Sequence, residues 1–333
     1  MNIGFTYDLK DDYLALGYTS EQAAEFDTLQ TIEGIGMALK HLGHQLDPIG
    51  NVHALIGRLC QGHRWDMVFN ICEGLHGTGR EAQVPALLEA CQIPYVFSDV
   101  MVLSLTLHKG MTKRIIRDLG IPTAPFVVAD NTRQLEDHGL AFPLFVKPVA
   151  EGTGKGIGPH CRIIDQDNLI QVAGQMLREF NQPVLIETFL PGREVTVGII
   201  GTGDQARVIG MMEVVFQDHE TSGIYSYENK DRYLEFIKYR PVEPDLYEQC
   251  AAVALLSWQG LGCRDGGRVD LRLDHLGVPN FMEVNPLAGL NPVHSDLPIL
   301  AAMAGITFQQ LIGMIMEAAM ARVAMNEESV PAK

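Results

Sequence analysis

Short apolar runs alternate with helix-spaced segments over the first third of the chain. Three short segments have strand length: Asn2–Thr6, Gln45–Pro48 and Met67–Ile71. Apolar positions recur at helical spacing between Leu29 and Leu42 and again over Glu81–Cys91, after which IPYVFS is extended. Strands that alternate with helices form parallel sheets. The pattern predicts an open α/β unit with a parallel sheet over residues 1–105.

Two further units follow along the chain. A basic helix over Leu107–Leu119 precedes a proline-punctuated extended run, and strands at Phe142–Pro148 and Pro183–Glu187 belong to a second α/β unit, placed at residues 106–190. Beyond it the strand patterns VTVGIIG, RVIGMMEVVF, RVDLRL and NFMEVN dominate, and an amphipathic helix follows them. We predict a third unit over residues 191–333.

Composition and charge remove several classes of function. With 333 residues, 47% of them hydrophobic and 20% charged, the chain can bury a large core in more than one domain. Its net charge of -16 repels nucleic acid and anionic lipid surfaces, so neither is an expected partner. No basic segment followed by an apolar one opens the chain, and the six cysteines lack C-x-x-C spacing. We expect reduced thiols and a cytoplasmic protein.

The segment RVDLRLDHLGVPNFMEVNP predicts an antiparallel hairpin with a loop of about six residues. A loop centred between Leu276 and Gly277 puts Asp270 opposite Glu283. Strand alternation adds Arg268 and Asn285 to the same face. The residues expected to point into the core are Val269, Leu271, Met282 and Val284.

Two carboxylates and one amide thus converge beside an arginine. Carboxylate and amide oxygens are ligands that suit Mg²⁺ in proteins, together with phosphate oxygens of a substrate. The hairpin predicts a magnesium site at Asp270, Glu283 and Asn285. The alternative is an ordinary ion network on an exposed hairpin face.

A glycine-rich loop, EGTGKGIG, follows the strand that ends at Pro148. Such loops bind phosphate through backbone N–H groups, and Thr153 adds a hydroxyl donor while Lys147 and Lys155 add charge. The chain has no G-x-x-x-x-G-K-[ST] sequence, and Pro159 disturbs any dinucleotide-binding pattern. The alternative is a loop that binds no ligand.

The segment VLIETFLPGREVTVGII places one acid, Glu187, at a strand end and another, Glu194, at the start of the next strand. The link between them can contact a purine edge through its backbone. The two acids can accept hydrogen bonds from the base amino group and the ribose hydroxyls. The alternative is that both are solvated surface charges.

Taken together, these motifs resemble the ATP-grasp superfamily and, within it, the D-alanine:D-alanine ligases. The resemblance runs over nearly the whole chain in one order: EGLHGTGREAQVPALLEACQIPYVFS, LHKGMTKRIIRDLGIPTAPF, FPLFVKPVAEGTGKGI, VLIETFLPGREVTVGI, RVDLRL, MEVNPLAGL and HSDLP. It implies an α/β, three-domain ATP-grasp fold. An N-terminal open parallel-sheet domain is joined to central and C-terminal α+β domains that clamp ATP.

The resemblance also implies roles for individual residues. Nucleotide contacts are implied at Lys109, Lys147, Glu187, Thr188, Phe189, Leu190, Glu194 and Lys230. The implied metal ligands are Asp270, Glu283 and Asn285, on two Mg²⁺ ions that Mn²⁺ can replace. The implied catalytic groups are Arg268, Lys230 and Thr153. Substrate contacts are implied at Glu25, Asp27, His76, Glu81, Asp231, Arg268, Gly289 and Ser295.

The implied chemistry is formation of an acyl phosphate followed by attack of an amine. Arg268 would steady the developing oxyanion beside the metals. His76 and Glu81 match positions near the amine of the first substrate. The alternatives are a helix cap for His76 and a helix N-terminal charge for Glu81.

Four departures from the family pattern touch the substrate end. The glycine-rich N-terminal segment with its acidic contact becomes FTYDLKDDYLALGYTSEQAAEFD, leaving Glu25 or Asp27 as candidates. The paired serines of the central loop become Gly-Thr-Gly. Asp231 replaces the tyrosine after Lys230, and the usual N-T-x-P-G-M-T becomes NPLAGLN. We expect Asp231 to favour a cationic or polar group, unless it lies on an exposed lid.

The sequence therefore predicts an ATP- and Mg²⁺-dependent carboxylate-amine ligase acting on small amino-acid or amine substrates, and the resemblance implies a homodimer. D-alanyl-D-alanine is the default product, and another amino-acid or amine pair is the alternative. Two other classes are a nucleotide-binding regulator and a Rossmann-type oxidoreductase. The retained metal and phosphate residues disfavour the regulator, and the loop after Lys147 disfavours the oxidoreductase.

Overall fold

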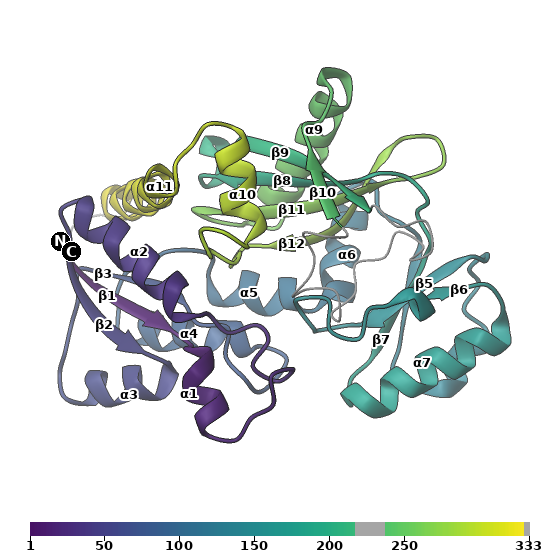
Figure 1. The fold of residues 1–333 in the computed structure, drawn as a ribbon, viewed down its shortest axis with the longest axis horizontal. Coiled ribbons are helices and arrows are strands. Elements are labelled where there is room, and N and C mark those ends of the chain that lie inside the picture. The colour runs from purple at the N-terminus through teal and green to yellow at the C-terminus, as the bar shows by residue number, and fades with distance from the viewer. Residues whose placement is uncertain (217–236, 330–333) are drawn as a thin grey trace.

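The computed structural model describes residues 1–216 and 237–329. Its N-terminal sheet is parallel, with strand order β2-β1-β3, which confirms the predicted parallel pairing (Figure 1). The strands are β1 (Asn2–Tyr7), β2 (Gln45–Gly50) and β3 (Met67–Ile71). The helices are α1 (Lys10–Ala15), α2 (Leu29–His41), α3 (Val52–Cys60) and α4 (Gln83–Ala90), with the 3-10 turn η1 (Arg80–Ala82) before α4. The predicted extended run IPYVFS forms only a single bridge, between Tyr95 and Val68.

The central sheet is antiparallel, with order β4-β7-β5-β6. Its strands are β4 (Phe126–Ala129), β5 (Leu144–Pro148), β6 (Arg162–Ile163) and β7 (Val184–Thr188), and α7 (Gln166–Phe180) packs beside them. The predicted helix over Leu107–Leu119 is wrong at its start: α5 (Val100–Leu107) and α6 (Lys109–Asp118) meet at a break. The break occurs because the His108 side chain accepts a hydrogen bond from the Met111 N–H and so caps α6.

The C-terminal sheet is antiparallel, with order β10-β9-β8-β11-β12. Its strands are β8 (Glu194–Ile200), β9 (Arg207–Phe216), β10 (Ile237–Arg240), β11 (Gly266–Leu273) and β12 (Pro279–Asn285). The helices are α9 (Pro244–Gly260), α10 (Asp296–Met303) and α11 (Phe308–Ser329). Short 3-10 turns complete the fold at η2 (Thr132–Leu135), η3 (Pro159–Cys161) and η4 (Gly203–Gln205).

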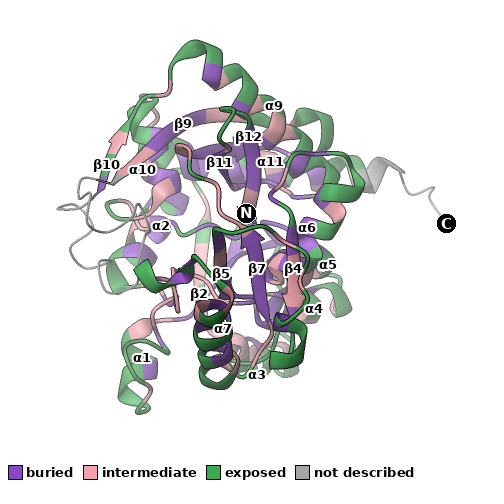
Figure 2. Ribbon diagram, turned by 90° about the vertical axis from the view of Figure 1, so that its right-hand side faces the viewer, coloured by how far each residue is buried: buried purple, intermediate pink, exposed green. Residues whose placement is uncertain are grey.

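Each of the two antiparallel sheets has one apolar face and one polar face. In the central sheet, Val146 and Ile186 pack with Leu169 and Met176 of α7, so the alternate positions carry Lys147, Leu185 and Glu187 on the opposite face. In the C-terminal sheet, Val197, Val269 and Leu271 pack with Trp258 of α9. The opposite face carries Thr196, Arg268 and Asp270. Figure 2 shows how strongly the strands are buried.

The N-terminal and C-terminal sheets share one hydrophobic core. Ile35 of α2 belongs to the same cluster as Leu311 and Ile315 of α11, and α11 lies against α2 (Figure 1). Arg322 of α11 adds a polar tie, because its guanidinium donates to the fully buried Asp265 at 2.8 and 2.9 Å and to the Tyr95 carbonyl at 2.7 Å. These two parts of the chain therefore form one body. The predicted boundaries at residues 105 and 190 stay a prediction.

In the described part of the chain, no single helix is long and apolar enough to cross a membrane. A pair bent by 109°, Asp296–Met303 with Phe308–Met325, passes the same test of length and composition only when its two helices are taken together.

Candidate active site

The predicted hairpin is present, and its register at the polar end is confirmed. Asp270 lies opposite Glu283, and Arg268 lies opposite Asn285. A bulge after Asp270 shifts the rest of the pairing, so that Leu271 lies opposite Phe281. The turn is consequently one residue shorter than predicted, spanning residues 274–278.

The same bulge corrects one predicted core residue. Phe281 is fully buried, and Met282, which we expected in the core, is half-exposed. The extra residue in β12 turns Phe281 toward the apolar face, where it joins Leu271 and Val284. The bulge thus keeps the two carboxylates opposite each other while the core below changes register.

Asp270 is held from three sides on the polar face. One carboxylate oxygen, Oδ1, accepts from the Thr196 hydroxyl at 2.9 Å, and the other, Oδ2, accepts from the Asn285 amide at 3.1 Å. Arg268 donates to the same carboxylate at 3.2 Å and to Asp296 at 2.9 Å. The arginine is therefore fixed between two acids beside the hairpin.

The electrostatics of the hairpin suit a bound cation. Burial raises the pKa of Asp270 to about 7, and the neighbouring Glu283 and Asp296 add to the shift against the effect of Arg268. A divalent cation would relieve this crowding of carboxylates, and the oxygen donors of Asp270, Glu283 and Asn285 suit Mg²⁺. Within residues 1–216 and 237–329, no cluster of three or more His, Cys, Asp and Glu side chains could hold a metal. The set at the hairpin has two such side chains and one amide.

Glu187 lies on the polar face of the central sheet between two lysines. Lys147 Nζ lies 3.1 Å from Glu187 Oε1, and the Lys113 ammonium of α6 contacts Oε2. Burial alone would raise the pKa of Glu187, but the two lysines outweigh it and lower the pKa to about 2. Glu187 is 6% exposed, so the alternative of a solvated surface charge is wrong for this residue.

Lys109 connects the two polar sheet faces. Its ammonium lies 3.8 Å from Glu283 Oε2 and donates to the Glu151 carbonyl at 2.5 Å. Burial alone would raise the pKa of Glu283, but the positive charges of Lys109, Lys147 and Arg268 outweigh it and lower the pKa. The candidate phosphate ligands therefore interact electrostatically with the candidate metal ligands.

The link after β7 lies between the same two sheets. The Phe189 ring is flanked by Arg162 and Arg272, whose guanidinium carbons lie 4.8 and 5.4 Å from its centroid. Arg272 also pairs with Glu194 at 3.1 Å. Burial raises the pKa of Glu194, with Glu283 adding to the shift and Arg272 opposing it. Thr188 and Leu190 are half-buried beside this ring.

The glycine loop contains one polar atom without a partner. The Thr153 hydroxyl is buried and has no hydrogen-bond partner, and its backbone has a φ of 50°, which is unusual for a residue with a side chain. The following Gly154 and Gly156 also have positive φ, of 74° and 73°. A hydroxyl without a partner in a strained glycine loop fits a phosphate oxygen that accepts a hydrogen bond from it.

Glu25 contacts this loop from the N-terminal segment. It accepts from the Gly152 N–H at 2.9 Å, pairs with Arg80 at 2.9 Å and lies 3.4 Å from the Lys155 ammonium. Arg80 also donates to the Ala150 carbonyl at 3.0 Å. Two departures from the family pattern, the N-terminal segment and the Gly-Thr-Gly loop, are therefore in direct contact with each other.

Other predicted substrate residues surround this contact. Burial raises the pKa of both Glu81 and Asp27 to about 7; Glu25 adds to the shift of Glu81, and Asp8 adds to that of Asp27. His76 is exposed on the turn before η1. In the segment between β12 and α10, the Ser295 hydroxyl accepts a hydrogen bond from the Asn291 N–H at 2.9 Å. The same hydroxyl packs against Gly289, where a Cβ would come within 2.8 Å of it. Lys230 and Asp231 lie outside the described residues.

Sequence reasoning missed four residues that the structure brings to the site: Arg80, Lys113, Thr196 and Asp296. All four contact predicted residues from other parts of the chain, and no local pattern marks Arg80, Lys113 or Asp296. Thr196 alone carried a signal, because it alternates with Glu194 on β8 and therefore shares its face.

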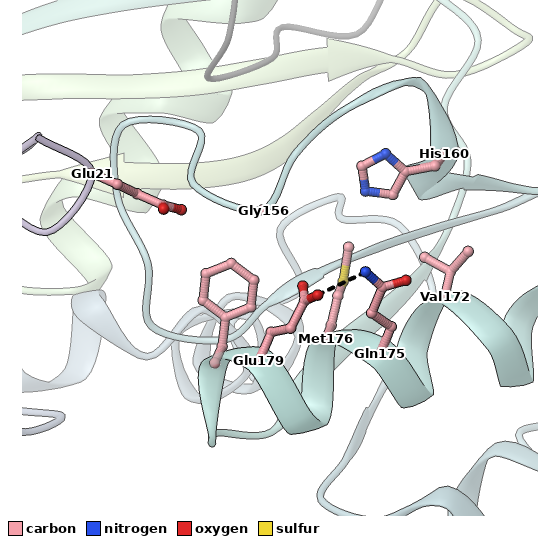
Figure 3. A pocket seen from close by; sticks show the side chains of 8 residues that line it. Glu21, Gly156, His160, Val172, Gln175, Met176 and Glu179 are labelled. Atoms are coloured by element: carbon pink, nitrogen blue, oxygen red, sulfur yellow. Dashed lines mark hydrogen bonds between the residues drawn. The ribbon is translucent and has the colours of Figure 1, made fainter. Parts of the chain in front are cut away.

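A pocket of about 200 Å³ lies next to the glycine loop, on the side of α7 (Figure 3). It is lined by Glu21, Gly156, His160, Val172, Gln175, Met176, Glu179 and Phe180. Glu21 approaches it from the N-terminal segment, and Gln175 donates to Glu179 at 2.7 Å along the helix. The pocket is separate from the polar sheet faces, since none of its lining residues belongs to them.

Comparisons with known proteins agree with this geometry. A family model described as "D-ala D-ala ligase C-terminus" matches residues 115–317. A D-alanine–D-alanine ligase of Rhodospirillum rubrum is 32% identical over 312 residues, covering 91% of this chain and 95% of that protein. The uncharacterized protein y4sG of Sinorhizobium fredii is also 32% identical, covering 76% of this chain and 74% of that protein.

The solved structures give the fold. The D-alanine–D-alanine ligase of Bacillus anthracis, crystallised with ATP, superposes with a TM-score of 0.72 at 24% identity, over 98% of this chain and 99% of that chain. The three-sheet arrangement is thus the ATP-grasp fold, as the sequence predicted. The family model and the relatives also show the family: the chain belongs to the D-alanine–D-alanine ligase family.

Proposed function

We propose that this chain is an ATP-dependent ligase of the D-alanine–D-alanine ligase type, which joins a carboxylate to an amine and releases ADP and phosphate. One observation carries the proposal. Lys109, a candidate phosphate ligand beside the central sheet, lies 3.8 Å from Glu283, a candidate metal ligand of the C-terminal sheet. A transferred phosphoryl group needs both kinds of group within one site.

The nucleotide is assigned to the space between the two polar faces. Lys147 and Lys109 would neutralise phosphate oxygens, and the Thr153 hydroxyl would donate to one of them. Glu187 would accept from the base amino group, and Glu194 would accept from the ribose. Backbone groups of Thr188, Phe189 and Leu190 would line the base. Lys230 keeps its assignment as a phosphate contact by resemblance.

Mg²⁺ is assigned to Asp270, Glu283 and Asn285. When bound there, it would neutralise phosphate charge during phosphoryl transfer. The number of ions and the replacement by Mn²⁺ belong to the proposal. Asp270 has a second role besides metal binding, because it orients Arg268. Arg268 would in turn hold the carbonyl oxygen of the reacting carboxylate.

The reaction is proposed in two steps. A carboxylate oxygen of the first substrate attacks the γ-phosphorus of ATP, and the bond to ADP breaks. The amine nitrogen of the second substrate then attacks the acyl carbon, the phosphate leaves with the electrons of the C–O bond, and the amine loses a proton. D-alanine in both positions is the default pair. The homodimer rests on the family resemblance alone, and the cytoplasmic location rests on the six cysteines, which lack C-x-x-C spacing.

The test is a phosphate-release assay with ATP, Mg²⁺ and pairs of amino acids, D-alanine alone being the first pair. We expect release that depends on both Mg²⁺ and an amino-acid pair, with the ligated product identified by mass spectrometry. Glu283→Ala removes one of the two metal carboxylates and should abolish turnover. Near-normal turnover in Glu283→Ala would contradict the metal assignment. ATP binding without release for any pair would instead favour a nucleotide-binding regulator.

A further inference from the structure

We propose that Lys113, a buried lysine of α6, is a positioning residue that fixes Glu187 for recognition of the adenine base. The inference rests on the proposed function, because it assumes that Glu187 faces the base of a bound nucleotide. None of the sequence motifs suggests a role for Lys113. Its contact with Glu187 in the structure suggests one.

Glu187 is held at both of its oxygens. Lys147 Nζ lies 3.1 Å from Oε1, and the Lys113 ammonium contacts Oε2. An ionised carboxylate offers about four lone-pair directions, so each oxygen keeps one for a further donor. One ammonium group at each oxygen therefore fixes the carboxylate and leaves room for a further donor.

Lys113 acts only through Glu187. Its side chain is 1% exposed, and its ammonium lies 5.5 Å from the centroid of the Phe126 ring. Glu187 is the only acid with which Lys113 forms an ion pair in residues 1–216 and 237–329. Burial does not separate the two lysines, since the Lys147 side chain is also only 3% exposed. Their positions do, because Lys147 lies at the end of β5 next to the glycine loop, whereas Lys113 lies within α6. The two lysines thus have different roles on one carboxylate.

The charges explain why a second lysine is needed. Burial lowers the pKa of Lys113 against the effect of Glu187, and burial alone would raise that of Glu187. With Lys147 alone, the carboxylate can turn to pair with it through both oxygens, away from the base. Lys113 prevents this rotation by holding Oε2 on the side of α6.

The consequence is selectivity among purines. A fixed, ionised carboxylate accepts a hydrogen bond from the 6-amino group of adenine and repels the 6-carbonyl oxygen of guanine. Loss of the fixed orientation should weaken this discrimination more than it slows the chemical steps. The relevant measure is the ratio of kcat/KM for ATP to kcat/KM for GTP.

The experiment compares Lys113→Met with Arg117→Met. Arg117 lies one turn later on α6, and its guanidinium carbon lies 5.3 Å from the centroid of the same Phe126 ring, yet it is exposed and makes no contact with Glu187. Because a hydrogen bond to a charged group contributes roughly 1.5–3 kcal/mol, Lys113→Met should lower the ATP-to-GTP ratio about tenfold or more. We expect kcat at saturating ATP to fall less than about threefold, and Arg117→Met to leave the ratio unchanged.

A double variant separates positioning from a general loss of structure. Lys113→Met with Glu187→Gln removes one charge of each sign, so the local net charge equals that of the wild type. If Lys113 acts through Glu187, adding Lys113→Met to Glu187→Gln should change the ratio less than about twofold. Lys113→Arg, which keeps a cation, should restore part of the ratio that Lys113→Met loses. Thermal unfolding of each variant reports on its folding.

The outcomes separate the two proposals. Wild-type protein that binds no ATP in calorimetry would overturn the proposed function, and the role of Lys113 with it. Wild-type protein that prefers ATP, with the same preference in Lys113→Met, would overturn only the role of Lys113. Equal effects of Lys113→Met in the wild-type and Glu187→Gln backgrounds would also overturn it.

Discussion

Glu25 bridges the N-terminal segment and the glycine loop, and the substitution Glu25→Gln tests what this bridge does. The variant keeps an oxygen that can accept from the Gly152 N–H, and it removes the negative charge that Arg80 and Lys155 face. Both partners of the main ion pair are buried, since the Glu25 and Arg80 side chains are 7% and 8% exposed. The hydrogen bond that the variant keeps and the ion pairs that it loses set how far it destabilises the closed glycine loop.

Removing one partner of a buried ion pair costs roughly 3–5 kcal/mol, because the other charge stays buried. The hydrogen bond that glutamine keeps to Gly152 recovers about 1 kcal/mol of this. The bond from Arg80 to the Ala150 carbonyl is unaffected. We therefore expect the closed loop to lose about 2–4 kcal/mol, which corresponds to a roughly 30-fold or larger rise in the population of the open loop.

Trypsin cleavage after Lys155 measures this population directly. The Lys155 side chain is 11% exposed and lies in the loop that Glu25 holds. Cleavage of a transiently opened segment follows the equilibrium population of the open form when reclosing is fast. Mass spectrometry of the Lys155–Gly156 bond should show faster cleavage in Glu25→Gln, and the KM for ATP should rise in parallel.

Glu21→Gln is the matched control. Glu21 belongs to the same N-terminal segment and approaches the same loop near Gly156 (Figure 3), but it is exposed and forms no ion pair within residues 1–216 and 237–329. We expect its cleavage rate to equal that of the wild type. Equal rates in Glu25→Gln and Glu21→Gln would refute the reasoning that Glu25 holds the loop closed.

Three further substitutions test other parts of the site. Lys147→Ala should weaken nucleotide affinity and turnover together, by roughly 1.5–3 kcal/mol for a charge-assisted phosphate contact, and unchanged ATP binding in calorimetry would remove Lys147 from the site. Asp27 has a folded pKa of about 7, above the ordinary 3.8, so the stability contributed by its protonated form is complete below about pH 3.8 and is lost as the pH rises through 7. Asp27→Asn should therefore lose less thermal stability than the wild type between pH 4 and pH 7, and parallel Tm curves would contradict the raised pKa. Asp231→Tyr should shift relative kcat/KM among amino-acid pairs and leave ATP affinity within a few-fold; equal activity on every pair, with D-alanine best for both proteins, would favour the ordinary dipeptide ligase.

The sequence predicted the elements whose signals are local. Alternation in β11 and β12 placed Asp270 opposite Glu283, because period two is set by the strand itself. The bulge between them carries no local mark, so the turn length and the burial of Met282 were predicted wrongly. The helix predicted over Leu107–Leu119 begins only at Lys109, and α5 before it was not predicted. The capping hydrogen bond at His108, which separates α5 from α6, likewise has no signal in the sequence.

Contacts between segments far apart in the chain were the second feature that the sequence did not predict. Glu25 was a candidate because it is an acid, but its partner Gly152 lies 127 residues away, and neither segment carries a signal that predicts their contact. Lys113 stands among the basic residues of HKGMTKRIIRD, where spacing does not distinguish a buried lysine from an exposed arginine. Burial of a charge depends on what packs over it, which only the tertiary structure fixes.

The core shared by α2 and α11 also bears on how the chain is made. Ile3 and Phe5, near the start, pack in one cluster with Leu311 and Ile315, near the end. During synthesis a domain normally folds once its own residues have emerged. Here the apolar side of α2 that packs against α11 must wait for the last helix before it is covered. Until then that surface stays open to chaperones, and a chain cut short before α11 would release it uncovered.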